Sequence, residues 1–180
     1  MSTSAHQSPA REPLPADDIG ELVLRCRTDR RFLAELRRLY EDVDRRQSAT
    51  GANCLGGGGC CKFDVAGHRL YLTAGELAFL TQAPPPRERQ AAPTSITSAP
   101  EHACDSRKPE LRCPYQRRGR CAAHDRRPLG CRAYFCRAAA HGPGPAIYEE
   151  FHRKLAALHE RFGLPYLYAE LTGALAQILP

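Results

Sequence analysis

The sequence predicts a small α+β domain that is mostly helical, in which short β-hairpins carry the cysteines and a bound metal stabilises the fold. Three observations lead to this prediction. Apolar residues recur at helical spacing near both ends of the chain. Short chain segments bounded by glycine and proline turns suit the strands of small β-hairpins. Nine cysteines, with 42% apolar but only 7% aromatic residues, indicate a thin core that metal ligation would reinforce.

The length of 180 residues suits one domain. Residues 1–16 are polar and rich in Ser, Pro and Ala, so we expect them to be disordered. Residues 17–180 form the predicted cysteine-cluster domain, with a flexible Pro- and Ser-rich insertion at about 83–109. No run is apolar enough for a membrane span or a signal peptide, which predicts a cytoplasmic protein without a membrane partner. In that reducing compartment the cysteines should serve metal ligation or redox chemistry rather than form disulfides.

The first part of the chain should be helical. Asp17 or Asp18 can cap a helix in which Ile19, Leu22, Val23 and Cys26 share one face. A second apolar set runs from Phe32 to Val43, so we expect two helices, or one kinked helix, to about Arg46. Cys26 lies on the apolar face and is predicted to be a buried structural thiol.

The first group of candidate ligands is Cys54, Cys60 and Cys61, separated by four consecutive glycines. Glycine lets backbone amides approach sulfur closely, and the Lys-Ser/Thr pair of a phosphate-binding loop is missing. Residues 62–65 and 69–72 should then form a hairpin. Thr73 and Glu76 match a capping box that opens a helix over 74–81.

The second group lies between Leu111 and Cys136 and contains Cys113, Cys121, Cys131 and Cys136. Residues 111–115 and 120–123 suit a hairpin with its turn at Arg118 and Gly119. The spacings of seven, nine and four residues match neither a zinc ribbon nor a ferredoxin. The pattern therefore indicates a metal without identifying it. Cys104 lies in the insertion and is left outside the ligand set.

Two amphipathic helices are expected at the carboxyl end. Apolar residues recur from Ile147 to Phe162, where Gly163 ends the first helix, and from Leu167 to Leu179 in a second helix that starts at Pro165. His152 and His159 share a face of the first of these helices. We expect both to be neutral surface histidines.

The net charge of +6 comes mainly from arginine, and seven arginines lie in the second cysteine group. Guanidinium groups stabilise an anionic thiolate site and lower thiol pKa values. Arg127 and Arg132 are candidates for binding an anion such as a carboxylate. No basic strand interleaved with aromatic residues is present, so nucleic acid is not the favoured partner.

These motifs resemble the CxxCxxCC cysteine-cluster family, whose members are described as zinc- or iron-chelating domains. The resemblance covers roughly residues 54–136 and depends on Cys54-x5-Cys60-Cys61, Thr73-x-x-Glu76, Cys113-Pro and the string Cys121-Ala-Ala-His124-Asp-Arg-Arg127-Pro128-Leu-Gly-Cys131-Arg132. It implies metal ligation by the seven cysteines of the two groups. The family's second cysteine is replaced by Gly57, and His124 occupies a position usually held by Tyr, which makes His124 a further candidate ligand.

The family includes the flagellin lysine N-methylases, in which the cysteine cluster looks like an iron–sulfur site serving S-adenosylmethionine chemistry. Those proteins are longer than this chain, so the resemblance does not carry their activity over. The leading hypothesis is an iron–sulfur or zinc protein. Iron–sulfur is favoured because the resemblance implies it and because seven thiols exceed the four of one closed zinc site. The alternatives are a group-transfer enzyme that binds S-adenosylmethionine at the cluster, or a zinc-stabilised module that binds nucleic acid or protein. The sequence assigns no catalytic residue.

Overall fold

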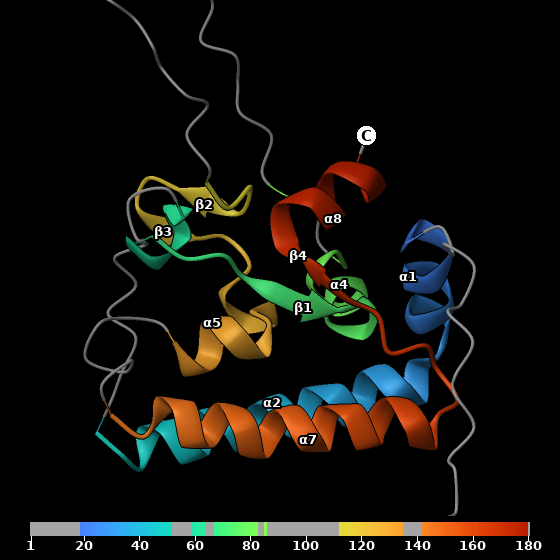
Figure 1. Ribbon diagram of the computed structural model, residues 1–180, viewed down its shortest axis with the longest axis horizontal. Coiled ribbons are helices and arrows are strands. Elements are labelled where there is room, and N and C mark those ends of the chain that lie inside the picture. Colours follow the sequence, from blue (N-terminus) through green and yellow to red (C-terminus); the bar gives the residue numbers. More distant parts are fainter. Residues whose placement is uncertain are drawn as a thin grey trace, which may run out of the picture.

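The computed structural model describes residues 19–51, 59–63, 67–82, 85, 112–134 and 142–179. Figure 1 shows a mostly helical molecule with two small antiparallel sheets, which confirms the predicted α+β class. Residues 1–16 and, apart from Pro85, the insertion at 83–109 lie outside the described residues. Within the described part of the chain, no helix is both long enough and apolar enough to cross a membrane.

The first two helices are α1 (Ile19–Thr28) and α2 (Arg30–Ser48), so two helices rather than one kinked helix form here. The break is at Asp29, whose carboxylate accepts hydrogen bonds from the backbone N–H groups of Arg31 and Phe32. This N-cap satisfies donors that the start of α2 would otherwise leave unpaired. Cys26 is fully buried, as predicted.

Helix α7 (Gly144–Arg161) lies alongside α2 and runs in the opposite direction (Figure 1). The predicted amphipathic helix is therefore confirmed, and Gly163, with φ at +59°, follows its C-cap residue Phe162. Phe32 and Leu36 of α2 and Phe151 and Leu155 of α7 are buried in the core. These two helices form the base on which the smaller elements pack.

The larger of the two sheets differs from the prediction. Strand β1 (Tyr71–Thr73) pairs with β4 (Tyr168–Glu170), not with residues 62–65, so the predicted hairpin is wrong. Lys62 instead forms an isolated antiparallel bridge with Arg112, and residues 64–66 lie outside the described chain. The helix expected from Pro165 begins only at Leu171, as α8 (Leu171–Ile178), because residues 168–170 are needed for the sheet.

The capping box predicted at Thr73 is confirmed and starts α4 (Ala74–Leu80). The Thr73 hydroxyl accepts a hydrogen bond from the Glu76 backbone N–H at 3.2 Å, and the Glu76 carboxylate accepts one from the Thr73 N–H at 2.7 Å. The carboxylate also reaches beyond its own helix, where it accepts hydrogen bonds from Tyr40 and Leu129. Glu76 therefore joins α4 to α2 and to the segment that carries Cys131.

His159 is fully buried on α7, so the expectation of a surface histidine is wrong. Its Nδ1 lies 2.9 Å from the carbonyl oxygen of Pro165 and donates a hydrogen bond to it, while its Nε2 has no hydrogen-bond partner among the described residues. The ring packs edge-on against Phe32. Burial lowers the pKa of His159, so the imidazole is held in its neutral form.

Candidate metal centre

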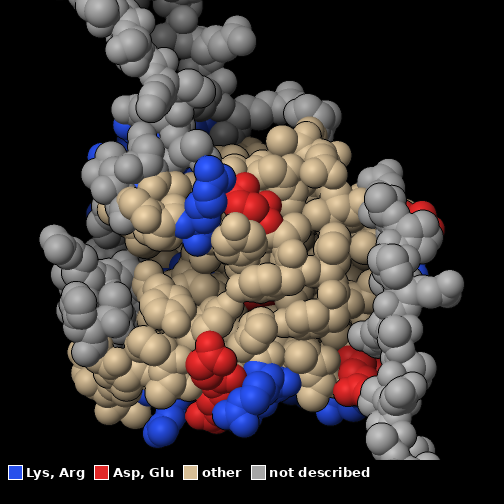
Figure 2. Space-filling view, viewed as in Figure 1, with Lys and Arg blue, Asp and Glu red and all other residues tan. Residues whose placement is uncertain are grey.

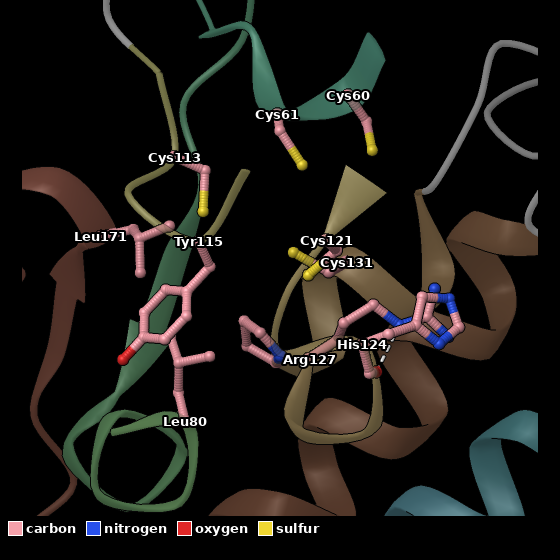
Figure 3. Close-up of a pocket in the computed structure, with 11 residues that line it drawn as sticks. Cys60, Cys61, Leu80, Cys113, Tyr115, Cys121, His124, Arg127, Cys131 and Leu171 are labelled. Carbon is pink, nitrogen blue, oxygen red and sulfur yellow. Dashed lines mark hydrogen bonds between the residues drawn. The ribbon is translucent and has the colours of Figure 1, made fainter. Parts of the chain in front are cut away.

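Five of the seven predicted cysteine ligands line one cavity of about 40 Å³. These five, together called the thiol pocket below, are Cys60, Cys61, Cys113, Cys121 and Cys131. Figure 3 shows the sulfur atoms of the first three directed towards the region that holds those of the last two. A water molecule needs only about 10–15 Å³, so the space accommodates an ion or a small group of atoms. Cys54 and Cys136 lie outside the described residues.

Two segments far apart in sequence bring Cys61 and Cys113 together. Cys61 ends the 3₁₀ helix η1 (Gly59–Cys61), and the backbone N–H of Cys113 donates to the Cys61 carbonyl oxygen at 2.9 Å. The thiol of Cys61 hydrogen-bonds with those of Cys60 and Cys113. The first and second cysteine groups therefore meet directly, as the sequence predicted.

Cys121 is placed by the predicted turn. Strands β2 (Gln116–Arg117) and β3 (Arg120–Cys121) pair across Arg118 and Gly119, which both have positive φ. The turn lies where it was predicted, but the first strand does not: β2 follows the predicted segment 111–115, while β3 covers the first two residues of the predicted segment 120–123. The hairpin presents Cys121 at its carboxyl end, beside Cys61 and Cys131.

Cys131 lies in the short helix α5 (Leu129–Ala133), which is held from both sides. The Leu129 N–H donates to Glu76 Oε1 at 2.8 Å, and the buried amide of Gln47 donates to the carbonyl oxygens of Arg132 and Ala133 at 3.2 Å. α5 therefore has a fixed position relative to α2 and α4, and Cys131 with it.

Proximity and burial raise the pKa values of Cys60, Cys61 and Cys131 and keep these three thiols protonated. The hydrogen bond with Cys113 is the largest cause that raises the pKa of Cys61, to about 12. Burial raises the pKa of Cys131 well above its ordinary value, and the neighbouring Cys61 and Cys60 raise it further. Several thiolates cannot coexist here without positive charge. A bound metal cation would supply that charge, and metal ligation deprotonates thiols.

Arg127 lines the same pocket, and its side chain is only 11% exposed. Its Nε donates to the carbonyl oxygen of His124 at 3.0 Å, and its Nη2 lies 3.9 Å from Asp44. Its Nη1 is buried and has no hydrogen-bond partner within the described chain. A buried donor of this kind calls for an acceptor, and an anionic sulfur centre in the pocket would provide one.

Arg132, the second arginine predicted to bind an anion, is held by the protein itself. Its side chain is 3% exposed and forms an ion pair with Asp44. It also donates to the carbonyl oxygens of Asp125 at 2.7 Å and Arg127 at 2.8 Å, and its guanidinium lies 4.3 Å from the centre of the Tyr40 ring. Of the two arginines, Arg127 alone therefore has an unpaired donor beside the pocket.

His124, the additional candidate ligand, borders the pocket in η2 (His124–Arg126). In Figure 3 its ring extends away from the five sulfur atoms. Burial and the nearby Arg127 lower the pKa of His124 and favour the neutral imidazole. A neutral imidazole can ligate a metal, but here it would first have to turn towards the thiols.

The five thiols lie close together, but their sulfur atoms are not arranged as the ligands of one metal ion. Among residues 19–51, 59–63, 67–82, 112–134 and 142–179, no three His, Cys, Asp or Glu side chains are placed to hold one metal ion. Ligation therefore requires some of the thiols to rotate towards a common point. The candidate site is a cluster of soft donors brought close by the fold.

Several residues that line the thiol pocket had no signal in the sequence. Tyr115, Leu80, Leu171 and Pro128 close it with apolar surface. Tyr115 is nearly fully buried, and burial raises its pKa to about 12, so its phenol stays neutral. Leu171 comes from the far end of the chain, and no motif links it to the cysteines. Glu76 was predicted as a cap, but its hydrogen bond to Leu129 had no signal in the sequence.

Comparisons with protein-family models, with curated proteins and with solved structures gave no match. The resemblance to the cysteine-cluster family therefore depends on the motif residues alone.

Proposed function

We propose that this protein holds a metal centre in the thiol pocket, with its ligands drawn from Cys60, Cys61, Cys113, Cys121 and Cys131, and that it works in a reducing compartment such as the cytoplasm. The observation that supports this most strongly is the meeting of five thiols from three separate segments in one small cavity. Thiolates are the ligands that zinc and iron–sulfur clusters prefer.

The surroundings of the pocket fit such a centre. Apolar side chains limit the access of water to it, and Arg127 offers a buried donor and a positive charge to anionic sulfur. A bound iron–sulfur cluster would supply electron transfer or Lewis acidity, whereas zinc would supply a structural cross-link. In either case Glu76 and Gln47 fix the position of the helix that carries Cys131.

We favour an iron–sulfur cluster over zinc. The five thiols that line the cavity exceed the four ligands of either a closed zinc site or a common iron–sulfur cluster, so their number does not choose between the two, and the preference comes from the resemblance to iron-chelating cysteine-cluster proteins. The unpaired donor of Arg127 also suits a cluster, because hydrogen bonds to sulfur help set the potential of such a centre. Zinc is the alternative, and direct metal analysis distinguishes the two.

The test compares cysteines inside and outside the pocket. We expect Cys61→Ser and Cys131→Ser to lose most of the iron or zinc that the wild-type protein retains after anaerobic purification. Cys26→Ser is the matched control, because Cys26 is fully buried in α1 and does not line the pocket. Equal metal content in all three variants, or no bound metal in the wild type, would exclude the proposal.

A further inference from the structure

A second feature lies outside the thiol pocket. Five of the seven tyrosines, together with His152, form one continuous group, called the tyrosine face below: Tyr71, Tyr134, Tyr148, Tyr166 and Tyr168. Four of them are exposed, and they account for four of the five large apolar side chains that are exposed in the described chain. Single exposed apolar residues are common, but a contiguous patch usually marks a binding surface.

The rings of the tyrosine face hold one another in place. Tyr71 of β1 stacks on Tyr168 of β4 at 5.7 Å between ring centres. Tyr148 stacks on His152 at 5.4 Å, and its hydroxyl hydrogen-bonds with that of Tyr168. The Tyr166 hydroxyl hydrogen-bonds with His152 at 2.7 Å. The face is therefore ordered before any partner arrives, which reduces the entropy cost of binding.

The chemistry of this face excludes some partners. It contains no Lys or Arg, although single-stranded nucleic acid needs cations for its phosphates. Figure 2 shows a broad uncharged area over β1, β4 and α5, with charged residues mainly at its edges. Phosphate-bearing ligands are therefore a poor fit, in spite of the net charge of +6.

Two glutamates influence the tyrosine face electrostatically: Glu76, which is buried in α4, and Glu149, which is exposed on α7. Burial raises the pKa of Tyr168, and the negative charges of Glu76 and Glu149 raise it further. Burial also raises the pKa of Tyr166, to about 12, and the negative charges of Glu76 and Tyr168 contribute to this shift. Aromatic rings backed by negative charge favour a cation. Among protein cations, the planar guanidinium of arginine stacks best on tyrosine rings.

We propose that the tyrosine face binds an arginine-bearing segment of a partner protein, with the guanidinium lying on the outer ring face of Tyr71 or of Tyr168. This inference is independent of any metal in the thiol pocket. The net charge of the chain is +6, so the molecule as a whole does not attract a cationic segment. The attraction for arginine must therefore come from the tyrosine face itself. The rings and the nearby carboxylates together provide it.

The experiment titrates the full-length protein with a labelled Gly/Ser peptide that carries two arginines. Matched peptides carry lysine or the uncharged isostere citrulline at the same positions. We expect the arginine peptide to bind most tightly, the lysine peptide more weakly and the citrulline peptide weakest. Removing one ring in Tyr71→Leu or Tyr168→Leu should weaken arginine binding roughly two- to fivefold.

Leu24→Ser is the matched control, because Leu24 is 58% exposed on α1, outside the tyrosine face. It should bind as the wild type does, and circular dichroism should show that all variants are folded. Equal affinity for the citrulline peptide, unchanged binding in the tyrosine variants, or no binding at about 1 mM peptide would overturn the proposal. So would sedimentation showing a dimer that the tyrosine variants lose, because the face would then bind a second copy.

Discussion

The guanidinium group of Arg127 has one nitrogen, Nη1, that is buried beside the thiol pocket with no hydrogen-bond partner in the described chain. Such a donor costs free energy unless something accepts its hydrogen bond. An anionic centre in the thiol pocket, which Arg127 lines, is the acceptor that we propose. Arg132, five residues later in the sequence, has a different role, because it is fully engaged with Asp44 and nearby carbonyl groups.

Replacing Arg127 with Gln should weaken metal retention. A hydrogen bond to a charged group contributes about 1.5–3 kcal/mol, which corresponds to a loss of roughly 10- to 100-fold in metal affinity. Competition with a chromophoric chelator measures this loss. Arg127→Lys, which keeps the charge but not the planar fork, should fall between Gln and the wild type. Wild-type affinity in the Gln variant would show that Arg127 does not act on the metal.

His159 should make the fold sensitive to mild acid. Burial lowers its pKa below the ordinary 6.5, so the folded protein resists taking up a proton that the unfolded chain accepts. The stabilisation is therefore fully present above about pH 6.5 and is lost as the pH falls towards the lowered pKa. Urea denaturation at pH 7.5 and at successively lower pH values should show the free energy of unfolding decreasing.

His159→Asn is the control for this prediction, because the Asn amide nitrogen can replace Nδ1 as the donor to Pro165 without titrating. Its stability should depend less on pH in the same range, whatever its absolute value. An identical pH dependence in the two proteins would assign the effect to other groups.

At the scale of single elements, α4 lies very close to its neighbours at Gly75. A methyl group added there would come within 2.5 Å of the Phe32 ring and 2.8 Å of His159 Nε2. Both rings are fully buried and have little room to move. Glycine is therefore required for α4 to approach α2 and α7.

Gly75→Ala should lower the free energy of unfolding by about 1–3 kcal/mol, the usual cost of overpacking a core. Thermal or urea denaturation measures the change. Gly173→Ala in α8 is the matched control: its nearest neighbour would be 3.5 Å away, so the better helix propensity of Ala should leave stability unchanged or slightly higher. Equal stability of the Gly75 variant and the wild type would show that the two rings can yield.

The elements that the sequence predicted correctly are those with local signals. Asp29 is a short-range cap, Thr73 and Glu76 form a capping box, and the stripe from Ile147 to Phe162 has helical period. The pairing of β1 with β4 had no such signal, because each strand has three residues and the two lie far apart in the chain. Three residues are too few to show alternation, so the apolar pattern of the β4 segment instead predicts the start of a helix.

At the scale of the whole molecule, the cysteines were easier to predict than their surroundings. Their residue type and clustering indicated one shared site, and the structure gathers the five described members of that set. The sequence could not show that Arg132 is enclosed, because its partner Asp44 is far away on α2. It also gave no sign of the tyrosine face, whose residues come from four separate segments.

The central claim is that the two cysteine groups form one metal centre. X-ray absorption at the iron and zinc edges of anaerobically purified protein tests it most directly, because it identifies both the metal and its ligands. We predict a first shell of sulfur, at about 2.3 Å if the metal is zinc, with additional iron scatterers if it is a cluster. Metal-free protein, or a first shell of only nitrogen and oxygen at about 2.0–2.2 Å, would contradict the account.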